Sequence, residues 1–342
     1  MNRKYILLAA ISVTAVCGII LVLFLANPIT KVNNKNEQRF KIEASYPSGA
    51  YFPLDNAVSS IDIKNNTKDT KEIWTDLKVL NRLDQVVYSE IKKSTAAGAS
   101  EITQDIGWTI PQDVATGSYR IEITVWDQSP ENKGATVLSK LQSTEKFMCY
   151  RTQEEFKKLD TTIWAVSNKT LGRTELKSKN VTVDNGKLKI TMPARKLEGG
   201  EIATTASQGY GAYEIRMKLP NAPSSITGFF LYEAPDYEYE IDVEVHNQPD
   251  GKLLLTTYAD GEAQNTYEGD LSFDPTAGFH NYRIEYYEER VDFYVDDIFI
   301  TGWADGIPKE KMKLMINSWY PNWLDGTSAK EEQSLVVDWV RY

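Results

Sequence analysis

Hydrophobic and polar residues alternate in short segments along most of this chain. In the stretch 237–246 the alternation is complete, with Tyr, Tyr, Ile, Val and Val on one face and Glu, Glu, Asp, Glu and His on the other. A period of two predicts a β-strand with one apolar and one polar face. Similar segments recur from residue 39 to the C-terminus, and no long helical period interrupts them. The pattern therefore predicts an all-β protein.

The alternating segments fall into two groups. Those within residues 39–150 are short and separated by turns, which predicts an immunoglobulin- or fibronectin-like β-sandwich that serves as an accessory domain. Those within residues 151–342 are more numerous and have no crossover helices, which predicts one large antiparallel sandwich. The strands expected in the first group are 40–44, 58–63, 73–80, 86–91, 119–125, 135–138 and 146–148. Those expected in the second are 181–183, 187–190, 213–219, 226–232, 237–246, 252–258, 282–287, 291–295, 313–318 and 335–341.

The N-terminus breaks the alternation. Residues 5–26 are apolar apart from two hydroxyl residues and one glycine. A helix of this length would span about 32 Å, close to the thickness of a bilayer core. The length of the run favours a transmembrane anchor at residues 1–27 over a cleaved signal peptide, which needs a shorter apolar core and a small-x-small cleavage site. Residues 28–38 are polar and predict a linker.

Composition excludes several classes of function. The 342-residue chain has a net charge of −10 and no basic block, so we expect no nucleic-acid partner. It has 2 Cys and 2 His, which leaves little room for a disulfide framework, a His-based triad or a zinc site.

The polar face of the 237–246 strand is unusual because it carries four acids and no Lys or Arg. Like charges in a row repel one another, so a solvated face normally mixes its signs. Glycoside hydrolysis needs two carboxyl groups, and Glu240 and Glu244 supply such a pair, with Asp242 between them to help keep one of them protonated through its charge. From the pattern alone three interpretations stay open: a hydrolase, a divalent-cation site and a solvated acidic face.

The sequence also resembles a known family over residues 154–342. Glu240-Ile241-Asp242-Val243-Glu244 is similar to the Glu-x-Asp-x-Glu signature of glycoside hydrolase family 16, and is closest to the form found in bacterial lichenases. Further segments resemble lichenases in order and spacing, namely 210–218, 228–232, 278–282, 292–296, 315–319 and 338–342. The resemblance implies a concanavalin-like β-jelly-roll with a long cleft.

The resemblance also implies roles for individual residues. Glu240 would be the nucleophile, Glu244 the general acid/base, and Asp242 their modulator. The positions expected to bind substrate are Glu201, Phe230, Tyr232, Glu238, His246, Tyr258, Asn317, Trp319 and Trp323. Two departures affect the substrate positions rather than the chemistry: Ala203 stands where lichenases carry a basic residue, and Glu238 stands where they carry Trp.

The resemblance implies no required cofactor. It does imply a structural calcium on the convex side, with Asp338 and the backbone carbonyl of Gly186 as expected ligands.

The expected function is an endo-β-glucanase that hydrolyses β-1,3-1,4-glucan with retention, through a covalent glycosyl-enzyme. The alternatives are a catalytically weak glycan-binding protein on the same fold, a transglycosylase, and a laminarin- or xyloglucan-active enzyme. A polysaccharide substrate implies a catalytic domain outside the cell, either on a single-pass anchor in the cell membrane or secreted. An anchored enzyme is expected to trim a glucan made by the same cell, next to the machinery that exports it.

Overall fold

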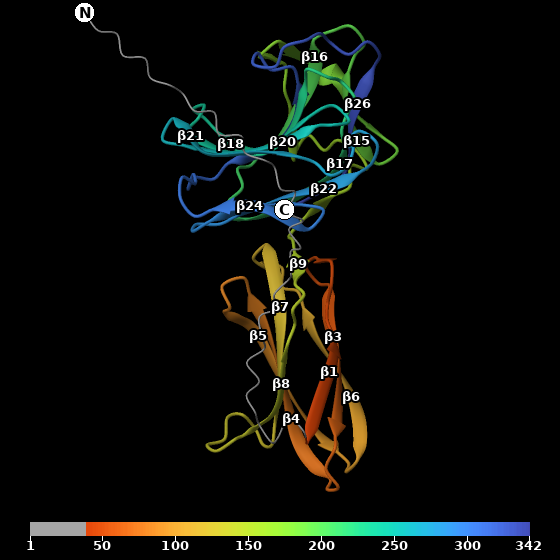
Figure 1. The fold of residues 1–342 in the computed structure, drawn as a ribbon, viewed down its shortest axis with the longest axis vertical. Coiled ribbons are helices and arrows are strands. Elements are labelled where there is room, and N and C mark those ends of the chain that lie inside the picture. The colour runs from red at the N-terminus through yellow and green to blue at the C-terminus, as the bar shows by residue number, and fades with distance from the viewer. Residues whose placement is uncertain (1–38) are drawn as a thin grey trace, which may run out of the picture.

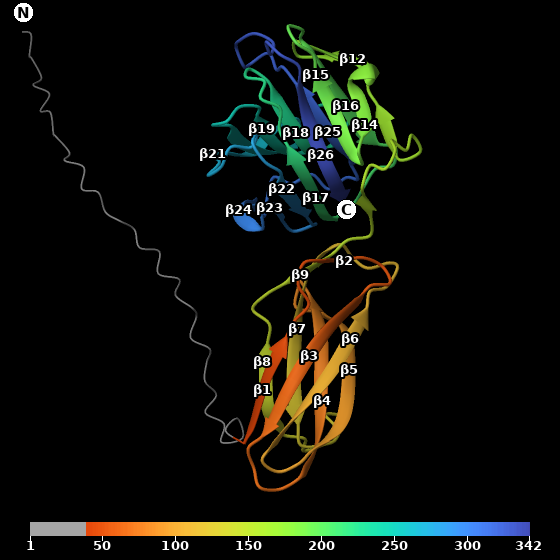
Figure 2. The ribbon, with the colours of Figure 1, turned by 90° about the vertical axis from the view of Figure 1, so that its right-hand side faces the viewer.

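The computed structural model describes residues 39–342, which form two β-sandwiches joined end to end (Figures 1 and 2). The expected anchor or signal peptide at 1–27 and the linker at 28–38 lie outside the described residues. The one helix in residues 39–342 is a 3-10 turn, η1 (Ser178–Asn180). No helix of this part of the chain has the length and apolar character needed to cross a membrane.

The N-terminal sandwich packs a sheet of order β1-β3-β6 against a sheet of order β2-β9-β7-β4-β5, with β8 paired to β7. Its core includes Trp108, which is 5% exposed. Near the start of β7 the Tyr119 hydroxyl donates a hydrogen bond of 2.6 Å to the Ala115 carbonyl. The strands are β1 (Phe40–Ser45), β2 (Ala50–Tyr51), β3 (Asn56–Asn65), β4 (Lys71–Asn81), β5 (Val86–Ala96), β6 (Ser100–Thr109), β7 (Gly117–Trp126), β8 (Val137–Gln142) and β9 (Phe147–Cys149).

The C-terminal sandwich also has two facing sheets. One has the order β14-β15-β26-β17-β22-β23-β24, with β10 beside β26; the other has the order β12-β13-β16-β25-β18-β19-β20-β21, with β11 beside β16. The strands are β10 (Gln153–Glu154), β11 (Trp164–Val166), β12 (Lys169–Leu171), β13 (Thr174–Leu176), β14 (Val181–Asp184), β15 (Lys187–Met192), β16 (Glu198–Thr204), β17 (Gly211–Lys218), β18 (Ile226–Glu233), β19 (Tyr239–His246), β20 (Lys252–Ala259), β21 (Glu262–Asp270), β22 (His280–Tyr286), β23 (Val291–Val295), β24 (Ile298–Trp303), β25 (Lys313–Trp319) and β26 (Gln333–Arg341).

The acidic strand lies inside the second of these sheets. β19 pairs antiparallel with β18 on one side and β20 on the other. Its apolar residues Ile241, Val243 and Val245 are buried in the core between the two sheets. The alternation predicted for this strand is therefore confirmed from residue 239 onward, and its acids face away from the core.

The start of this strand differs from the prediction. β19 begins at Tyr239, and Tyr237 lies in the preceding loop with a φ of +68°. A left-handed backbone does not fit a β-ladder. Tyr237 is 55% exposed rather than part of the apolar face.

The two sandwiches meet on the outer face of the sheet opposite β19. Tyr150, at the junction, donates a hydrogen bond of 2.8 Å to Glu214 on β17, and Thr116 accepts one of 3.0 Å from the Ala212 amide. Arg82 stacks on Tyr287 with its guanidinium carbon 3.5 Å from the ring centroid. The N-terminal sandwich thus covers the face of the C-terminal sandwich that lies away from the acidic row.

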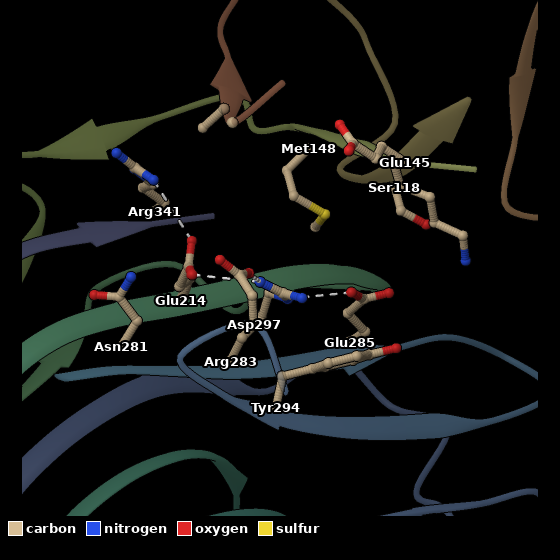
Figure 3. Close-up of a pocket in the computed structure, with 13 residues that line it drawn as sticks. Ser118, Glu145, Met148, Glu214, Asn281, Arg283, Glu285, Tyr294, Asp297 and Arg341 are labelled. Carbon is tan, nitrogen blue, oxygen red and sulfur yellow. Dashed lines mark hydrogen bonds and ion pairs between the residues drawn. The ribbon is translucent and has the colours of Figure 1, made fainter. Parts of the chain in front are cut away.

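Buried charges line a cavity of about 500 Å³ at this junction (Figure 3). Arg283 lies at its centre, within 3.1 Å of Glu285 and 3.4 Å of Glu214, and it also contacts Asp297. Arg341 approaches Glu214 from the other side at 3.6 Å. The carboxylates of this junction cluster are therefore matched by guanidinium groups.

Candidate active site

The three acids of β19, Glu240, Asp242 and Glu244, form a row along the strand on the outer face of the sheet. Antiparallel register sets Glu240 opposite Tyr232 on β18 and Tyr258 on β20. The same register sets Asp242 opposite Phe230 and Glu244 opposite Gly228. Side chains directly opposite on one face of a sheet lie close together, so the acids sit among aromatic rings on both sides.

Gly228 keeps the row open beside Glu244. A Cβ at this position would lie 2.8 Å from Oδ1 of Asn317 and 3.2 Å from the Phe230 ring. The absence of a side chain here therefore leaves room over the sheet for a ligand.

A cleft of about 490 Å³ lies over this row. It contains all three acids and most of the residues predicted to bind substrate. Its lining residues are Lys169, Leu171, Gly172, Glu201, Phe230, Tyr232, Asp236, Tyr237, Glu240, Asp242, Glu244, Tyr258, Met315, Asn317, Trp319, Asn322 and Trp323.

Two predicted substrate residues do not line the cleft. Glu238 lies in the turn before β19, where its amide donates a 3.2 Å hydrogen bond to the Pro235 carbonyl. His246 is the last residue of β19 and packs against Trp323, with ring centroids 6.0 Å apart. His246 thus supports a cleft residue, and Glu238 lies in the turn outside the cleft lining.

Tyr237 is a cleft residue that sequence reasoning missed. Its ring lies 5.4 Å from the Tyr258 ring, centroid to centroid, at an angle of 49°. The left-handed φ that removes it from the strand also directs it over the cleft. A non-glycine residue held at positive φ costs about 1–3 kcal/mol, and such residues gather at functional sites. The alternation of 237–246 hid this residue because Tyr237 fits the apolar face equally well by sequence.

Glu201 lies in the same cleft, three strands away from Glu244. It lies on β16 in register with Asn317, and it is only 1% exposed. Its Oε1 accepts hydrogen bonds from Ser167 at 2.7 Å and pairs with Lys169 at 2.8 Å, while Asn317 donates to its Oε2 at 3.3 Å. Protein donors therefore occupy both of its oxygens.

Several polar atoms in the cleft have no protein partner. Oδ1 of Asn317 and Nε1 of Trp319 are buried and unpaired. Buried polar atoms are nearly always hydrogen-bonded, so these two are suited to meet a polar ligand. The Trp323 ring, at 56% exposed, gives the cleft an open apolar surface as well.

Burial without cations raises the pKa of every member of the acid row. Desolvation raises the pKa of Asp242 well above its usual range, and the neighbouring Glu240 and Glu244 charges raise it further. Desolvation also raises the pKa of Glu244 to about 7, with a contribution from the Glu240 charge. Burial therefore favours the protonated form of both residues.

Glu240 differs from Glu244 in one respect. Desolvation raises its pKa to about 7, but a hydrogen bond with Asp242 lowers the pKa and so favours the ionised form. The charge that adds to the raised pKa of Glu244 is that of Glu240. The predicted role of the Asp242 charge, to keep one glutamate protonated, stays a prediction.

Residues 169–341 match the family described as glycosyl hydrolases family 16. The chain belongs to glycosyl hydrolases family 16. The match contains the whole acid row and every residue that lines the cleft.

Individual members of family 16 are similar over the same region. The chain is 30% identical to a beta-glucanase of Acetivibrio thermocellus over 178 residues, which are 48% of this chain and 53% of that protein. It is 30% identical to a beta-glucanase of Paenibacillus polymyxa over 177 residues, 48% of this chain and 74% of that protein. A solved structure of a prokaryotic beta-1,3-1,4-glucanase (lichenase) from a mouse hindgut metagenome is 25% identical with a TM-score of 0.50, and covers 56% of this chain and 97% of that one.

These findings confirm the predicted resemblance to family 16 and to its lichenases, and the jelly-roll fold. The chain spans about half the length of the Acetivibrio thermocellus relative. The roles of the individual site residues stay predictions.

The residues expected to hold calcium in this family 16 chain do not fit that ion. The Asp338 carboxylate contacts the Lys187 ammonium and lies 3.3 Å from the Arg216 guanidinium. Two cations already neutralise this carboxylate, whereas calcium needs several free oxygen ligands. Gly186 has a φ of +68° after Asn185 at +50° and forms the two-residue turn between β14 and β15. In residues 39–342 no group of three or more His, Cys, Asp or Glu side chains is arranged to bind a metal.

Proposed function

We propose that this chain is an endo-acting β-glucan hydrolase that retains the anomeric configuration, with β-1,3-1,4-glucan as substrate. The observation that carries the proposal is the row of three acids in the cleft, with Asp242 buried between two half-buried glutamates and no ion pair to any of them. Burying unpaired carboxyl groups costs folding free energy, and groups whose pKa values are raised in this way are typical of functional sites. The names of the beta-glucanase and lichenase relatives support the choice of substrate.

The two glutamates would divide the chemistry. The Glu240 carboxylate attacks the anomeric carbon while Glu244 gives its proton to the departing glycosidic oxygen, which forms a glycosyl-enzyme ester and releases one sugar chain. Glu244, now ionised, then removes a proton from water, which attacks the same carbon and frees Glu240. The hydrogen bond from Asp242 stabilises the Glu240 carboxylate before attack and after release.

The remaining lining residues would bind the polysaccharide. Aromatic rings present flat apolar faces to the sugar rings, and Tyr237, Tyr258 and Trp323 are placed to do so on opposite sides of the acids. Asn317 and Trp319 offer an acceptor and a donor to sugar hydroxyl groups. A cleft of this kind suits binding within a chain rather than at its end.

The test is a substrate panel of barley β-glucan, laminarin, xyloglucan and agarose with wild-type enzyme and Glu240→Ala. The proposal predicts the fastest release of reducing ends from barley β-glucan and none with the variant. If wild type cleaves no substrate but binds one, the chain is a glycan-binding protein on this fold. Products longer than the substrate would identify a transglycosylase, and preference for laminarin or xyloglucan would change the substrate.

We propose that the N-terminal sandwich is an immunoglobulin-like spacer. The Tyr119 hydrogen bond to the backbone four residues upstream is typical of a tyrosine corner, which supports this class. The sandwich packs on the face opposite the cleft, so it leaves the substrate path free.

We further propose that the apolar segment at 1–27 spans the cell membrane and holds the catalytic domain outside the cell, close to the machinery that exports the cell's own glucan. Cell fractionation tests the location. Activity should sediment with membranes, and activity confined to the culture supernatant would refute the anchor.

A further inference from the structure

Lys169 is the only basic residue among those that line the cleft. It lies on the short strand β12, and its side chain is 50% exposed. Its ammonium is held 2.8 Å from Oε1 of Glu201, whose side chain is almost completely buried. A half-exposed lysine tied to a buried carboxylate has a fixed position and still has N–H donors free to bind a ligand.

The position of Lys169 follows from the strand register. Glu244 on β19, Gly228 on β18, Asn317 on β25 and Glu201 on β16 lie opposite one another in a single line across the sheet. Three strand spacings separate Glu244 from Glu201, which is roughly 14 Å along the cleft. Lys169 therefore lies at the far end of the line that begins at the proposed acid/base.

The same line holds a second group suited to a ligand. Oδ1 of Asn317 is buried and has no protein partner, and it points toward the space that Gly228 leaves open. An acceptor at Asn317 and a cationic donor at Lys169 together match the alternating donors and acceptors of sugar hydroxyl groups. Glu201 holds both groups in place, because its Oε1 pairs with Lys169 and its Oε2 accepts the hydrogen bond from Asn317.

On the basis of the proposed function, we propose that Lys169 forms a distal subsite that binds hydroxyl groups of the glucan chain several sugar residues from the bond that is cleaved. The ligand is a long neutral glucan, and the subsite favours chains long enough to reach it. Glu201 is a positioning residue for this subsite.

The test compares wild type, Lys169→Ala and Lys177→Ala on mixed-linkage oligosaccharides of increasing length and on the polymer. Lys177 pairs with Glu198 outside the cleft and is the matched control. We expect Lys169→Ala to raise KM for the polymer about tenfold, as expected for one charge-assisted hydrogen bond. We expect kcat to change less than about twofold and the shortest cleaved oligosaccharide to show no effect. Lys169→Arg should restore part of the affinity, and Lys177→Ala should behave as wild type.

Two results would overturn the subsite. An equal loss on short and long substrates would indicate that Lys169 only supports the structure around Glu201, and no loss on any substrate would exclude contact. Binding of the polymer to Glu240→Ala, with and without Lys169→Ala, is measured by affinity gel electrophoresis and does not depend on turnover. If wild type cleaves no glucan, the proposed function fails, while weaker retardation of the Lys169→Ala form would still support the subsite.

Discussion

The C-terminal sandwich carries two groups of buried and half-buried carboxylates, one on each outer face. On the cleft face, Glu240, Asp242 and Glu244 form no ion pair with a Lys or Arg of residues 39–342, and all three have raised pKa values. On the opposite face, Glu214 and Glu285 surround Arg283 under the N-terminal sandwich (Figure 3). The residue types are the same, but only the second group is electrically compensated.

This difference separates a functional site from a structural one. Burial also raises the pKa of Glu285, but the Arg283 charge offsets part of that effect. A paired carboxylate needs its partner to stay folded, and loss of one member of a buried pair is strongly destabilising. An unpaired row of acids adds nothing to stability, and groups with strongly raised pKa values gather at functional sites. The variants below test this separation from both sides.

Glu240→Gln should give the largest change. We expect kcat to fall by about 10⁴-fold or more, as for loss of other catalytic nucleophiles. The fold should become more stable at pH 8. A carboxyl whose folded pKa is raised from 4.5 to about 7 loses stability as pH rises through that window, and the amide removes this loss. Initial rates and urea unfolding at pH 5 and pH 8 measure both effects. If the variant is less stable than wild type at pH 8, Glu240 has a structural role like that of the paired carboxylates around Arg283.

Arg283→Met should show the opposite behaviour. Buried Glu285 loses its guanidinium partner and Glu214 loses one of its two, so we expect the free energy of unfolding to fall by about 3–5 kcal/mol, with kcat/KM of the folded enzyme within about twofold of wild type. Urea denaturation and initial rates measure these values. Arg216→Met on the same sheet is the control, because its pair with Asp338 is partly exposed and should contribute under about 1 kcal/mol. A large loss of activity with intact stability would contradict the structural role.

Asp242 should respond to the loss of its hydrogen bond more than to the loss of its charge. Asp242→Ala removes the donor that lowers the pKa of Glu240, so the acidic limb of the kcat/KM profile should move to higher pH. Asp242→Asn keeps a donor, and its acidic limb should stay near that of wild type. A pH profile for each variant decides the point. Equal shifts in both variants would mean that the charge of Asp242 sets the pKa.

Tyr237→Gly tests the strained loop at the end of the cleft. Glycine adopts a φ of +68° freely, so the variant should be stabilised slightly, while loss of the ring should raise KM about two- to tenfold. Thermal unfolding and steady-state kinetics measure the two effects. An unchanged KM would remove Tyr237 from the substrate path.

Glu238→Gln should give the smallest effect. The side chain does not line the cleft, so we expect less than a twofold change in kcat/KM on barley β-glucan. A larger change would restore the substrate role that its sequence position implied.

Sequence reasoning succeeded where alternation and the core agree. β19 has an uninterrupted apolar face from Tyr239 onward. The acids on its other face were found from the family motif and from the order of the other family-like segments along the chain. It missed β16, which carries Glu201, because Gly199 and Gly200 interrupt the pattern. These glycines permit close approach of neighbouring groups, and a Cβ on Gly199 would lie 2.1 Å from the Ser318 carbonyl. It also missed β6, because the many polar residues of this segment hide the alternation, and the strand is recognised only from its pairing with β3.

The cleft residues that sequence could not supply depend on tertiary contacts. Lys169 lies on a three-residue strand, too short to show a period, and only the fold brings it to Glu201. The position of Tyr237 in the cleft depends on its positive φ, whereas the alternating pattern predicted an extended backbone there. The partners of Asp338 likewise come from β15 and β17, which are distant in sequence, and these two cations neutralise the carboxylate that was expected to bind calcium.

The most direct test of the central claim is to trap the covalent intermediate. A glucan-derived 2-deoxy-2-fluoro glycoside with a good leaving group is incubated with the enzyme, which is then digested and mapped by mass spectrometry. The account predicts one sugar adduct on the carboxyl of Glu240 and no adduct in Glu240→Ala. An adduct on another residue, or turnover with inversion and no adduct, would contradict the role given to the unpaired acids.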